Sequence, residues 1–322
     1  MIQTIERIEK MMAASLSETQ ARELHVTLVA CLCGNGCNYT DKSIEEFIID
    51  FLNAKRLEGC SERSIRYYCS TLCRFADSTH SPIGQITTDE IRCYLAEYRN
   101  LNGAGNITID NIRRVLSSFF SWLEEEDFIY KSPVRRIKKI RSTRMIKPVY
   151  SDESLEDLRD ACANARDLAI IDLLASTGIR VGELVKLNRS DMCFESRECV
   201  VRGKGDKERK VYFDARTKVH LQAYLEERTD NNDALFVSIH KPFRRLEISG
   251  VELRLRHLGK VANVLGVHPH KFRRTLATRA IDKGMPIEQV QVLLGHSKID
   301  TTLCYAMVDQ ANVKQSHRKY IA

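Results

Sequence analysis

Apolar residues recur every three or four positions along most of this chain, and that spacing restricts it to a mainly helical fold. Residues 1–33 and 41–130 both show the pattern, and the second range contains no strand-like alternation. There the pattern predicts four or five helices, one capped by Ser61 and another by Thr88 or Asp89. Helices of this number and length pack into a compact bundle.

The second half of the chain, residues 148–322, combines helices with one short strand-like stretch. β-Branched residues flank a turn at 203–206, which predicts a hairpin formed by 198–202 and 208–213. A strongly apolar helix ends at Gly178, and another short helix begins soon after it. The expected fold class is therefore mainly α with a small β-hairpin or sheet, an α+β arrangement.

The clearest boundary in the chain is a basic segment at 131–147. No acidic residue occurs between Phe128 and Ser151. Eight basic residues occupy the segment: Lys131, Arg135, Arg136, Lys138, Lys139, Arg141, Arg144 and Lys147. It is either a solvated linker or a strap along a phosphate backbone, in which each cation displaces about one counterion. The segment alone favours neither interpretation.

The length of 322 residues suits two domains of roughly 100–200 residues each. We expect an N-terminal helical arm at 1–40, a helical domain at 41–130, the basic linker and a second domain at 148–322. No apolar run approaches the roughly 18 residues of a membrane span, and the N-terminus does not resemble a secretory signal. The protein is therefore expected in the cytoplasm.

Charge and cysteine content exclude little by themselves. The formal net charge of +7 is weak support for a nucleic-acid partner, because the distribution of charge matters more than its total. The 11 cysteines would be reduced thiols in the cytoplasm. The tightest group, Cys31, Cys33 and Cys37, lacks the paired spacing of zinc sites, so we expect no bound metal.

Two segments of the second half contain cations in positions suited to a phosphate. Arg180 follows a glycine turn at the start of a short helix, where backbone N–H groups and a guanidinium can both face an anion. Lys204 lies in the turn of the predicted hairpin, which lacks the pattern of an ATP-binding loop. Taken singly, each is more commonly a solvated surface residue.

Two further segments follow towards the C-terminus. His270 and Arg273 are three positions apart and share a helix face, so both can point at one ligand. His296 follows a glycine at the end of an apolar helix, and Tyr305 lies nine positions later. A single histidine or tyrosine there is more commonly a loop or packing residue, so only the whole set carries information.

The set closely resembles the catalytic signature of tyrosine recombinases, the family of phage integrases and Xer recombinases. The matching segments read TGIRVGELVKL, GKGDKERKVYF, HPHKFRRTLAT and LLGHSKIDTTLCYAMV. The resemblance covers essentially all of 148–322, and it is weaker over 41–130, which resembles the family's helical, SAM-like core-binding domain. The first 40 residues match nothing recognisable.

The resemblance implies a role for each residue of the set. Tyr305 is the nucleophile that forms a covalent phosphotyrosine, and it must lose its proton during attack because an ordinary phenol has a pKa of about 10. Arg180 and Arg273 clamp the non-bridging oxygens, and His296 donates a further hydrogen bond. The remaining implied roles are a general acid at Lys204, assistance to proton transfer at His270 and positioning of the site by Glu183.

The chain departs from the family's usual sequence at two positions, and the resemblance also has an implication for cofactors. Arg274 stands where many family members have a histidine, and it adds charge near the DNA. A second tyrosine, Tyr320, lies well outside the matching segment and is the less favoured nucleophile. The phosphotyrosine bond conserves the energy of the broken linkage, and the cations neutralise the phosphate, so the resemblance implies neither ATP nor a metal ion as cofactor.

The resemblance also implies partners. These are duplex DNA with an inverted-repeat recombination site and further copies of the chain, which is a monomer or weak dimer when free and a homotetramer on paired sites. Accessory DNA-bending factors are further partners of such enzymes. The cations of the basic segment and Arg274 would contact DNA, and no membrane partner is expected.

Several roles fit such an enzyme. The 40 additional N-terminal residues favour integration, excision or inversion of a mobile element over a minimal housekeeping enzyme. Xer-type resolution of chromosome or plasmid dimers is the alternative within the family. A type IB topoisomerase uses related chemistry, but the compact size and the segment from His296 to Tyr305 favour a recombinase. The alternative of another class is a non-catalytic DNA-binding regulator, against which the intact set counts.

Overall fold

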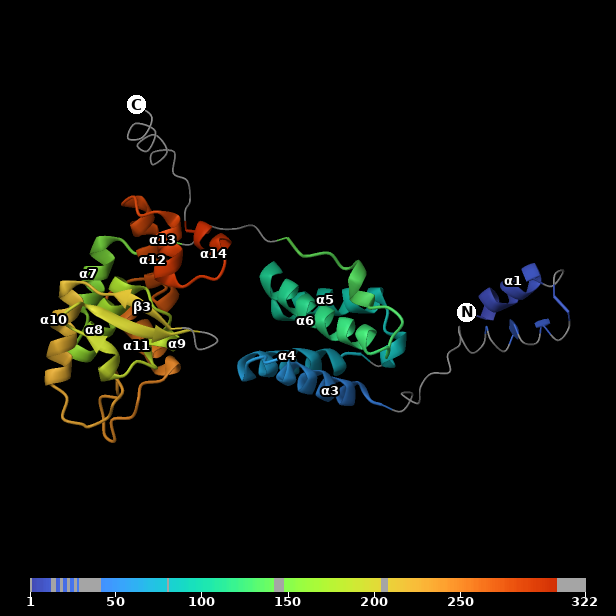
Figure 1. The fold of residues 1–322 in the computed structure, drawn as a ribbon, viewed down its shortest axis with the longest axis horizontal. Coiled ribbons are helices and arrows are strands. Elements are labelled where there is room, and N and C mark those ends of the chain that lie inside the picture. The colour runs from blue at the N-terminus through green and yellow to red at the C-terminus, as the bar shows by residue number, and fades with distance from the viewer. Residues whose placement is uncertain are drawn as a thin grey trace, which may run out of the picture. The chain divides into compact units, whose positions relative to one another are not determined.

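The computed structural model describes residues 2–12, 16–17, 20–21, 24–25, 28, 42–79, 81–141, 148–203 and 208–305. The chain divides into two compact units, Met1–Met145 and Ile146–Ala322 (Figure 1), and each is described by itself. Some residues named above lie outside the described residues: Cys31, Cys33, Cys37, Arg144, Lys147, Lys204 and Tyr320.

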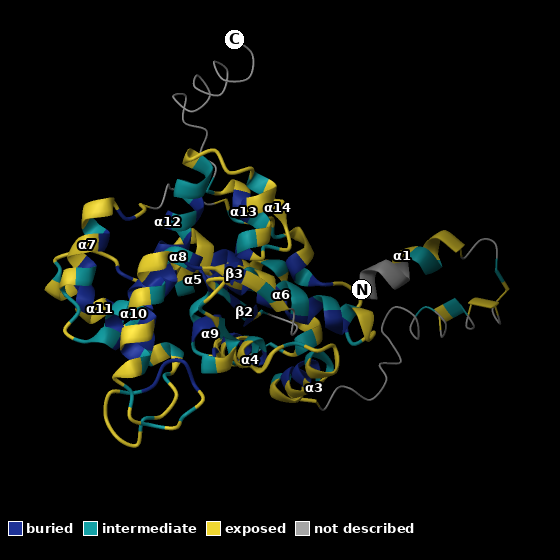
Figure 2. Cartoon of the chain, turned by 60° about the vertical axis from the view of Figure 1, so that its left-hand side comes forward, coloured by how far each residue is buried: buried dark blue, intermediate teal, exposed yellow. Residues whose placement is uncertain are grey.

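The first unit contains a bundle of helices. After α1 (Ile2–Met12), it comprises α3 (Ile44–Leu57), α4 (Glu62–Ala76), α5 (Thr88–Asn102) and α6 (Asn106–Glu125), with 3-10 turns η1 (Ile83–Gln85) and η2 (Pro133–Arg136). Apolar faces meet in a core that includes Phe51, Leu72 and Phe119, none of which is exposed to solvent. The helices of the bundle therefore carry buried and exposed residues side by side (Figure 2), as the three-to-four spacing predicts.

Side-chain caps determine where these helices begin. Ser61 accepts a hydrogen bond from a backbone N–H of the first turn of α4, as predicted. The cap of α5 is Thr87, so the prediction of Thr88 or Asp89 was wrong. Thr87 has an extended backbone, with φ −97° and ψ 162°, and it exchanges two hydrogen bonds with Glu90 in a capping box.

The described part of the basic segment is held against α6. Asp110 accepts hydrogen bonds from the backbone N–H of Ile140 at 3.0 Å and from Arg113 Nε at 2.9 Å. Asn106 Nδ2 donates to the backbone oxygen of Arg141 at 2.9 Å. The basic side chains here are exposed: Lys131, Arg135, Arg136, Lys138, Lys139 and Arg141. The backbone of this stretch is thus fixed while its charges face solvent.

The second unit combines helices with an antiparallel sheet. Its helices are α7 (Asp152–Asp160), α8 (Ala165–Thr177), α9 (Val181–Leu184), α10 (Ala215–Glu226), α11 (Ile248–Val261), α12 (Pro269–Asp282), α13 (Ile287–Leu294) and α14 (Ile299–Leu303), with the 3-10 turn η3 (Arg189–Asp191). The sheet order is β1 (Met192–Cys193), β2 (Glu198–Arg202) and β3 (Glu208–Tyr212). Arg202 pairs with Glu208 and Val201 with Arg209, which are the pairs nearest in sequence to Lys204.

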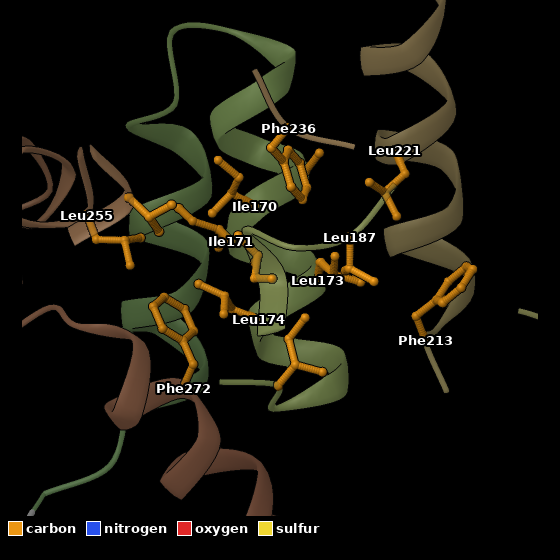
Figure 3. Close-up of a cluster of buried hydrophobic side chains, with 14 of the residues drawn as sticks. Ile170, Ile171, Leu173, Leu174, Leu187, Phe213, Leu221, Phe236, Leu255 and Phe272 are labelled. Carbon is orange, nitrogen blue, oxygen red and sulfur yellow. The ribbon is translucent and has the colours of Figure 1, made fainter. Parts of the chain in front are cut away.

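Helix α8 forms the centre of the second core. Its buried side chains lie among those of the surrounding helices (Figure 3), and the cluster includes Ile170, Ile171, Leu173 and Leu174 of α8, Leu221 of α10, Leu255 of α11 and Phe272 of α12. A helix that is apolar on most sides is stable only when it is surrounded in this way. The packing fixes the end of α8, where Gly178 follows, and the start of α12.

The predicted fold class, mainly helical with a small sheet, is confirmed. The predicted hairpin is present, but the sheet has a third, two-residue strand, β1, that the sequence pattern did not indicate. Helix α7 was not predicted either, and the short helix expected after Gly178 is α9, which has only four residues. Among the described residues, no helix is both long and apolar enough to cross a membrane.

The contacts of Asp110 generate a test of the first unit. Asp110→Ala removes the acceptor for Ile140 and Arg113, so we expect a loss of about 2 kcal/mol of unfolding free energy and faster hydrogen exchange at the Ile140 amide. Asp89→Ala, which removes an exposed ion pair with Arg92, is the matched control and should change stability by less than about 1 kcal/mol. Unchanged exchange at Ile140 would show that Asp110 does not hold the segment.

Candidate active site

A glycine turn brings Arg180 to the surface of the second core. Gly178 ends α8 in the left-handed region, at φ +59°, and a Cβ there would lie 2.8 Å from Leu276 Cδ2. Both the backbone conformation and the space therefore require glycine. Arg180 is the N-cap of α9, and its backbone N–H donates to Glu183 Oε2 at 2.9 Å. That N–H is occupied by Glu183, and α9 has only four residues, so the contact of Arg180 with a phosphate stays a prediction that rests on its guanidinium.

Glu183 is the most heavily hydrogen-bonded carboxylate of this cluster. Its side chain is 4% exposed and accepts from Arg180 Nη1 at 2.8 Å. Arg209 donates to both of its oxygens, through Nη1 and Nη2, each at 2.7 Å. Burial acts to raise the pKa of Glu183, but the hydrogen bonds and charges of Arg209 and Arg180 outweigh it and lower the pKa to about 2. Glu183 is therefore ionised at neutral pH.

The second arginine of the set, Arg273, is nearly fully buried on α12. It is 2% exposed, and it donates to the backbone oxygen of Gly178 at 2.7 Å and to that of Leu294. Arg180 Nη2 donates to the backbone oxygen of Gly295 at 3.2 Å. Burial and the nearby charge of Arg180 lower the pKa of Arg273, although a guanidinium stays charged at neutral pH. Both cations thus bind the carbonyl end of α13, where the helix dipole is negative.

His296 lies directly after this helix end. Its Nδ1 is 2.9 Å from Oγ1 of Thr302, a residue with no exposed surface. Its ring stacks on Tyr305, with ring centroids 5.9 Å apart and planes at 28°. Burial and the charges of Arg273, Arg180 and Arg209 lower the pKa of His296 to about 4. The imidazole is therefore neutral at pH 7 in the DNA-free protein.

Tyr305 follows the short helix α14, and its backbone N–H donates to the oxygen of Thr302 at 2.9 Å. The side chain is half-buried and packs against the small apolar cluster of α12 and α13. His270 lies one turn before Arg273 on α12, and burial followed by the charges of Arg273 and Arg180 lowers its pKa. Arg273, His296 and Tyr305 therefore come together from three helices or their ends.

Most of the predicted catalytic residues lie together, and one of them is not described. The structure brings together five of them: Arg180, Glu183, Arg273, His296 and Tyr305. His270 is close enough that, besides burial, the charges of both arginines lower its pKa. Arg274 is half-buried, and its Nε has no hydrogen-bond partner in the described part of the chain. Lys204 lies outside the described residues, and only the strand ends that flank its turn are placed.

Sequence reasoning missed two residues of this cluster, Arg209 and Thr302. Arg209 is on β3, where it alternates with exposed neighbours and shares an inward face with the buried Val211. A cation at an inward-facing strand position was a signal that could have been used. In the described ranges, no group of three or more His, Cys, Asp or Glu side chains could hold a metal ion.

Comparisons with known proteins show what the chain is similar to. A model of the "Phage integrase family" matches residues 149–312, and one of the "Phage integrase, N-terminal SAM-like domain" matches 47–129. A tyrosine recombinase XerC of Leptospira interrogans is 31% identical over 295 residues, which is 87% of this chain and 94% of that protein. A tyrosine recombinase XerC of Oceanobacillus iheyensis is 28% identical over 293 residues, 86% of this chain and 96% of that protein.

The fold is similar to that of a solved transposon integrase. The Tn1549 transposon integrase, in complex with a circular intermediate DNA, matches with a TM-score of 0.70 and 19% identity over 85% of this chain and 98% of that one. Fold and relatives together define a tyrosine-type site-specific DNA recombinase. The chain belongs to the phage integrase family, as the four sequence segments predicted.

The environment of His296 makes a prediction about pH. Its resonances in the DNA-free protein should titrate with a midpoint of about 4, well below the ordinary value of 6.5. Because the folded-state pKa is depressed, the stability contributed by neutral His296 is complete above about pH 6.5 and is lost as the pH falls towards 4. NMR titration checks this, with His296→Gln to assign the resonances. A midpoint at or above 6.5 would contradict the proposed influence of the three arginines.

Proposed function

We propose that this recombinase cuts and rejoins duplex DNA with Tyr305 as the nucleophile, through a 3′-phosphotyrosine intermediate. The observation that carries the proposal is the convergence of Arg180, Arg273 and His296 beside Tyr305. A concentration of cations beside a phenol suits a scissile phosphate better than a neutral substrate.

The two arginines stabilise the charge that develops on the phosphate. Attack by the phenol oxygen places negative charge on the non-bridging oxygens, and planar guanidinium groups of Arg180 and Arg273 match them in pairs. A preorganised donor of this kind typically contributes about 3–4 kcal/mol to transition-state stabilisation. The Thr302 hydroxyl donates to Nδ1 of His296 in this proposal, which leaves the proton of the neutral ring on Nε2 for the phosphate.

Proton transfers complete the cleavage step. The bond between the Tyr305 oxygen and phosphorus forms as the bond to the 5′ oxygen breaks, and Lys204 protonates that leaving oxygen. The phenol loses its proton as it attacks, and His270 assists by taking up that proton, a role suited to an imidazole that its lowered pKa keeps neutral. Religation reverses these steps, because the phosphotyrosine conserves the bond energy. The mechanism therefore requires neither a nucleotide nor a metal ion.

Duplex DNA is the proposed partner of both units. The support is the DNA in the complex of the similarly folded Tn1549 integrase, together with the exposed cations of the basic segment, from Lys131 to Arg141. We assign these, with Arg144 and Arg274, to contacts with phosphates. The proposed domains are the arm at 1–40, the DNA-binding bundle at 41–130, the linker at 131–147 and the catalytic domain at 148–322.

The proposed assembly is a homotetramer on two paired inverted-repeat sites, formed from free monomers or weak dimers and assisted by accessory DNA-bending factors. The proposed role is integration, excision or inversion of a mobile element in the cytoplasm, and it rests on the 40 N-terminal residues beyond the family's core. Dimer resolution is the second candidate because the chain spans 94% and 96% of two XerC relatives.

A covalent trapping assay tests the nucleophile. Labelled DNA from both sides of the encoding gene carries nicks that prevent religation, and it is incubated with protein in EDTA without ATP. Wild type and Tyr320→Phe should give a protein–DNA adduct on a denaturing gel, and Tyr305→Phe should give none. An adduct that persists in Tyr305→Phe and disappears in Tyr320→Phe would assign the nucleophile to Tyr320.

A sulfur-substituted substrate tests Lys204. A 5′-bridging thiolate leaves without taking up a proton, so Lys204→Ala should slow cleavage of ordinary DNA by roughly 100-fold or more and cleavage of the sulfur substrate far less. Lys207→Ala changes a second lysine three positions along the chain and should leave both rates close to wild type. Equal slowing of both substrates by Lys204→Ala would remove Lys204 from the acid role.

A further inference from the structure

Arg209 belongs to none of the roles assigned above, yet it makes the strongest ion pair of the cluster. Its side chain is 15% exposed, and Nη1 and Nη2 each donate to a different oxygen of Glu183 at 2.7 Å. This paired geometry fixes the plane of the carboxylate as well as its distance. The two residues are 26 positions apart in the chain, so the contact joins β3 to α9.

The opposite side of the same carboxylate holds Arg180. Glu183 Oε1 accepts from Arg180 Nη1 at 2.8 Å, and Oε2 accepts from the Arg180 backbone N–H at 2.9 Å. Each oxygen of Glu183 is therefore shared by the two arginines. The carboxylate of Glu183 orients Arg180. Arg209 in turn orients that carboxylate.

Arg209 also changes the net charge of the group formed by Arg180 and Glu183. Arg180 and Glu183 alone would form a neutral pair, and much of the attraction of Arg180 for a phosphate would be cancelled. Arg209 adds a second cation to the same carboxylate, so the three side chains together carry a net charge of about +1. Glu183 can then position Arg180 without neutralising it.

Arg209 also contacts the turn before His296. A Cβ on Gly295 would lie 2.9 Å from Arg209 Cδ and 3.0 Å from its Nε, so the side chain packs directly on the Gly295 backbone. The oxygen of Gly295 accepts from Arg180 Nη2 at 3.2 Å. Arg209 thus touches both the carboxylate that orients Arg180 and the backbone that carries His296.

We propose that Arg209 is a positioning residue for the strand-cleavage reaction, which holds Glu183 and the Gly295 turn so that Arg180 presents an unneutralised guanidinium to the scissile phosphate. This role rests on the function proposed above. Arg209 itself makes no contact with the phosphate and transfers no proton.

The test compares two substrates under single-turnover conditions at saturating protein. One is the nicked DNA of the trapping assay, and the other carries a methylphosphonate at the scissile position, which removes the negative charge that Arg180 neutralises. Arg209→Met keeps the length of the side chain but loses its charge and donors. It should slow adduct formation on ordinary DNA roughly 10- to 100-fold, the range typical of groups that orient a ligating residue.

Comparing the rates on the phosphate and methylphosphonate substrates distinguishes a positioning role from a merely structural one. Relative to wild type, Arg209→Met should slow the methylphosphonate reaction much less than the phosphate reaction, and Arg209→Lys should recover part of the phosphate rate. In an Arg180→Met background, Arg209→Met should add little, because both changes remove the same effect. Lys210→Met, an equal charge change on the exposed face of β3, is the matched control and should leave both rates near wild type.

Other results would contradict the positioning role of Arg209, the proposed function, or both. A wild-type rate for Arg209→Met, or equal slowing of both substrates, would overturn the positioning role while leaving the proposed function intact. If Arg209→Met does not fold, the proposal depends on Arg209→Lys, and an equal loss on both substrates would overturn it. No adduct from wild type with either substrate would overturn the proposed function, and the role of Arg209 with it.

Discussion

The other contacts of the cluster depend on the carboxylate of Glu183. Arg273 is almost completely buried, and its burial together with the charges of Arg180 and Arg209 lowers its pKa. Burying several cations together is unfavourable unless opposite charges and acceptors surround them. Glu183 supplies four hydrogen-bond contacts to two of these arginines, and this explains why a residue that transfers no proton is nevertheless kept ionised and buried.

Helix ends supply the remaining acceptors. The last carbonyl groups of an α-helix have no partner within the helix, and two helices of the second unit end beside the cluster. Gly178 follows α8 and Gly295 follows α13, both in the left-handed region. Oxygens of Gly178, Leu294 and Gly295 accept from Arg273 and Arg180. The same two glycine turns lead the chain directly into Arg180 and His296, so the backbone that binds the cations also places the functional side chains.

Local sequence signals explain which parts of the fold could be predicted. Most helices followed from apolar spacing, because that pattern depends only on neighbours along the chain. Helix α7 was missed because only Leu155 and Leu158 are buried on it, too few to form a periodic pattern. The start of α5 was misplaced by one or two residues among adjacent residues able to cap, although Glu90, three positions after Thr87, identifies the capping box.

The site, like the fold, has features that the sequence predicts and features that it does not. The four segments identified residues by resemblance, but their contacts depend on which elements meet in space. The pair of Arg209 and Glu183 joins β3 to α9, and no spacing along the chain reports it. Thr302 is similar: a threonine in a short helix is unremarkable until its hydroxyl is found beside the Nδ1 of His296.

The excess of positive charge has one further consequence for the chemistry. In the DNA-free protein, burial and the charges of the arginines keep His296 neutral and lower the pKa of His270. A phosphate that enters the cluster brings negative charge into contact with the same groups, and by Coulomb's law it must raise the pKa of both imidazoles. Their affinity for protons is therefore coupled to occupancy of the site. In the free protein both imidazoles are neutral at pH 7, each with a single N–H, and they become stronger bases only when a phosphate occupies the cluster.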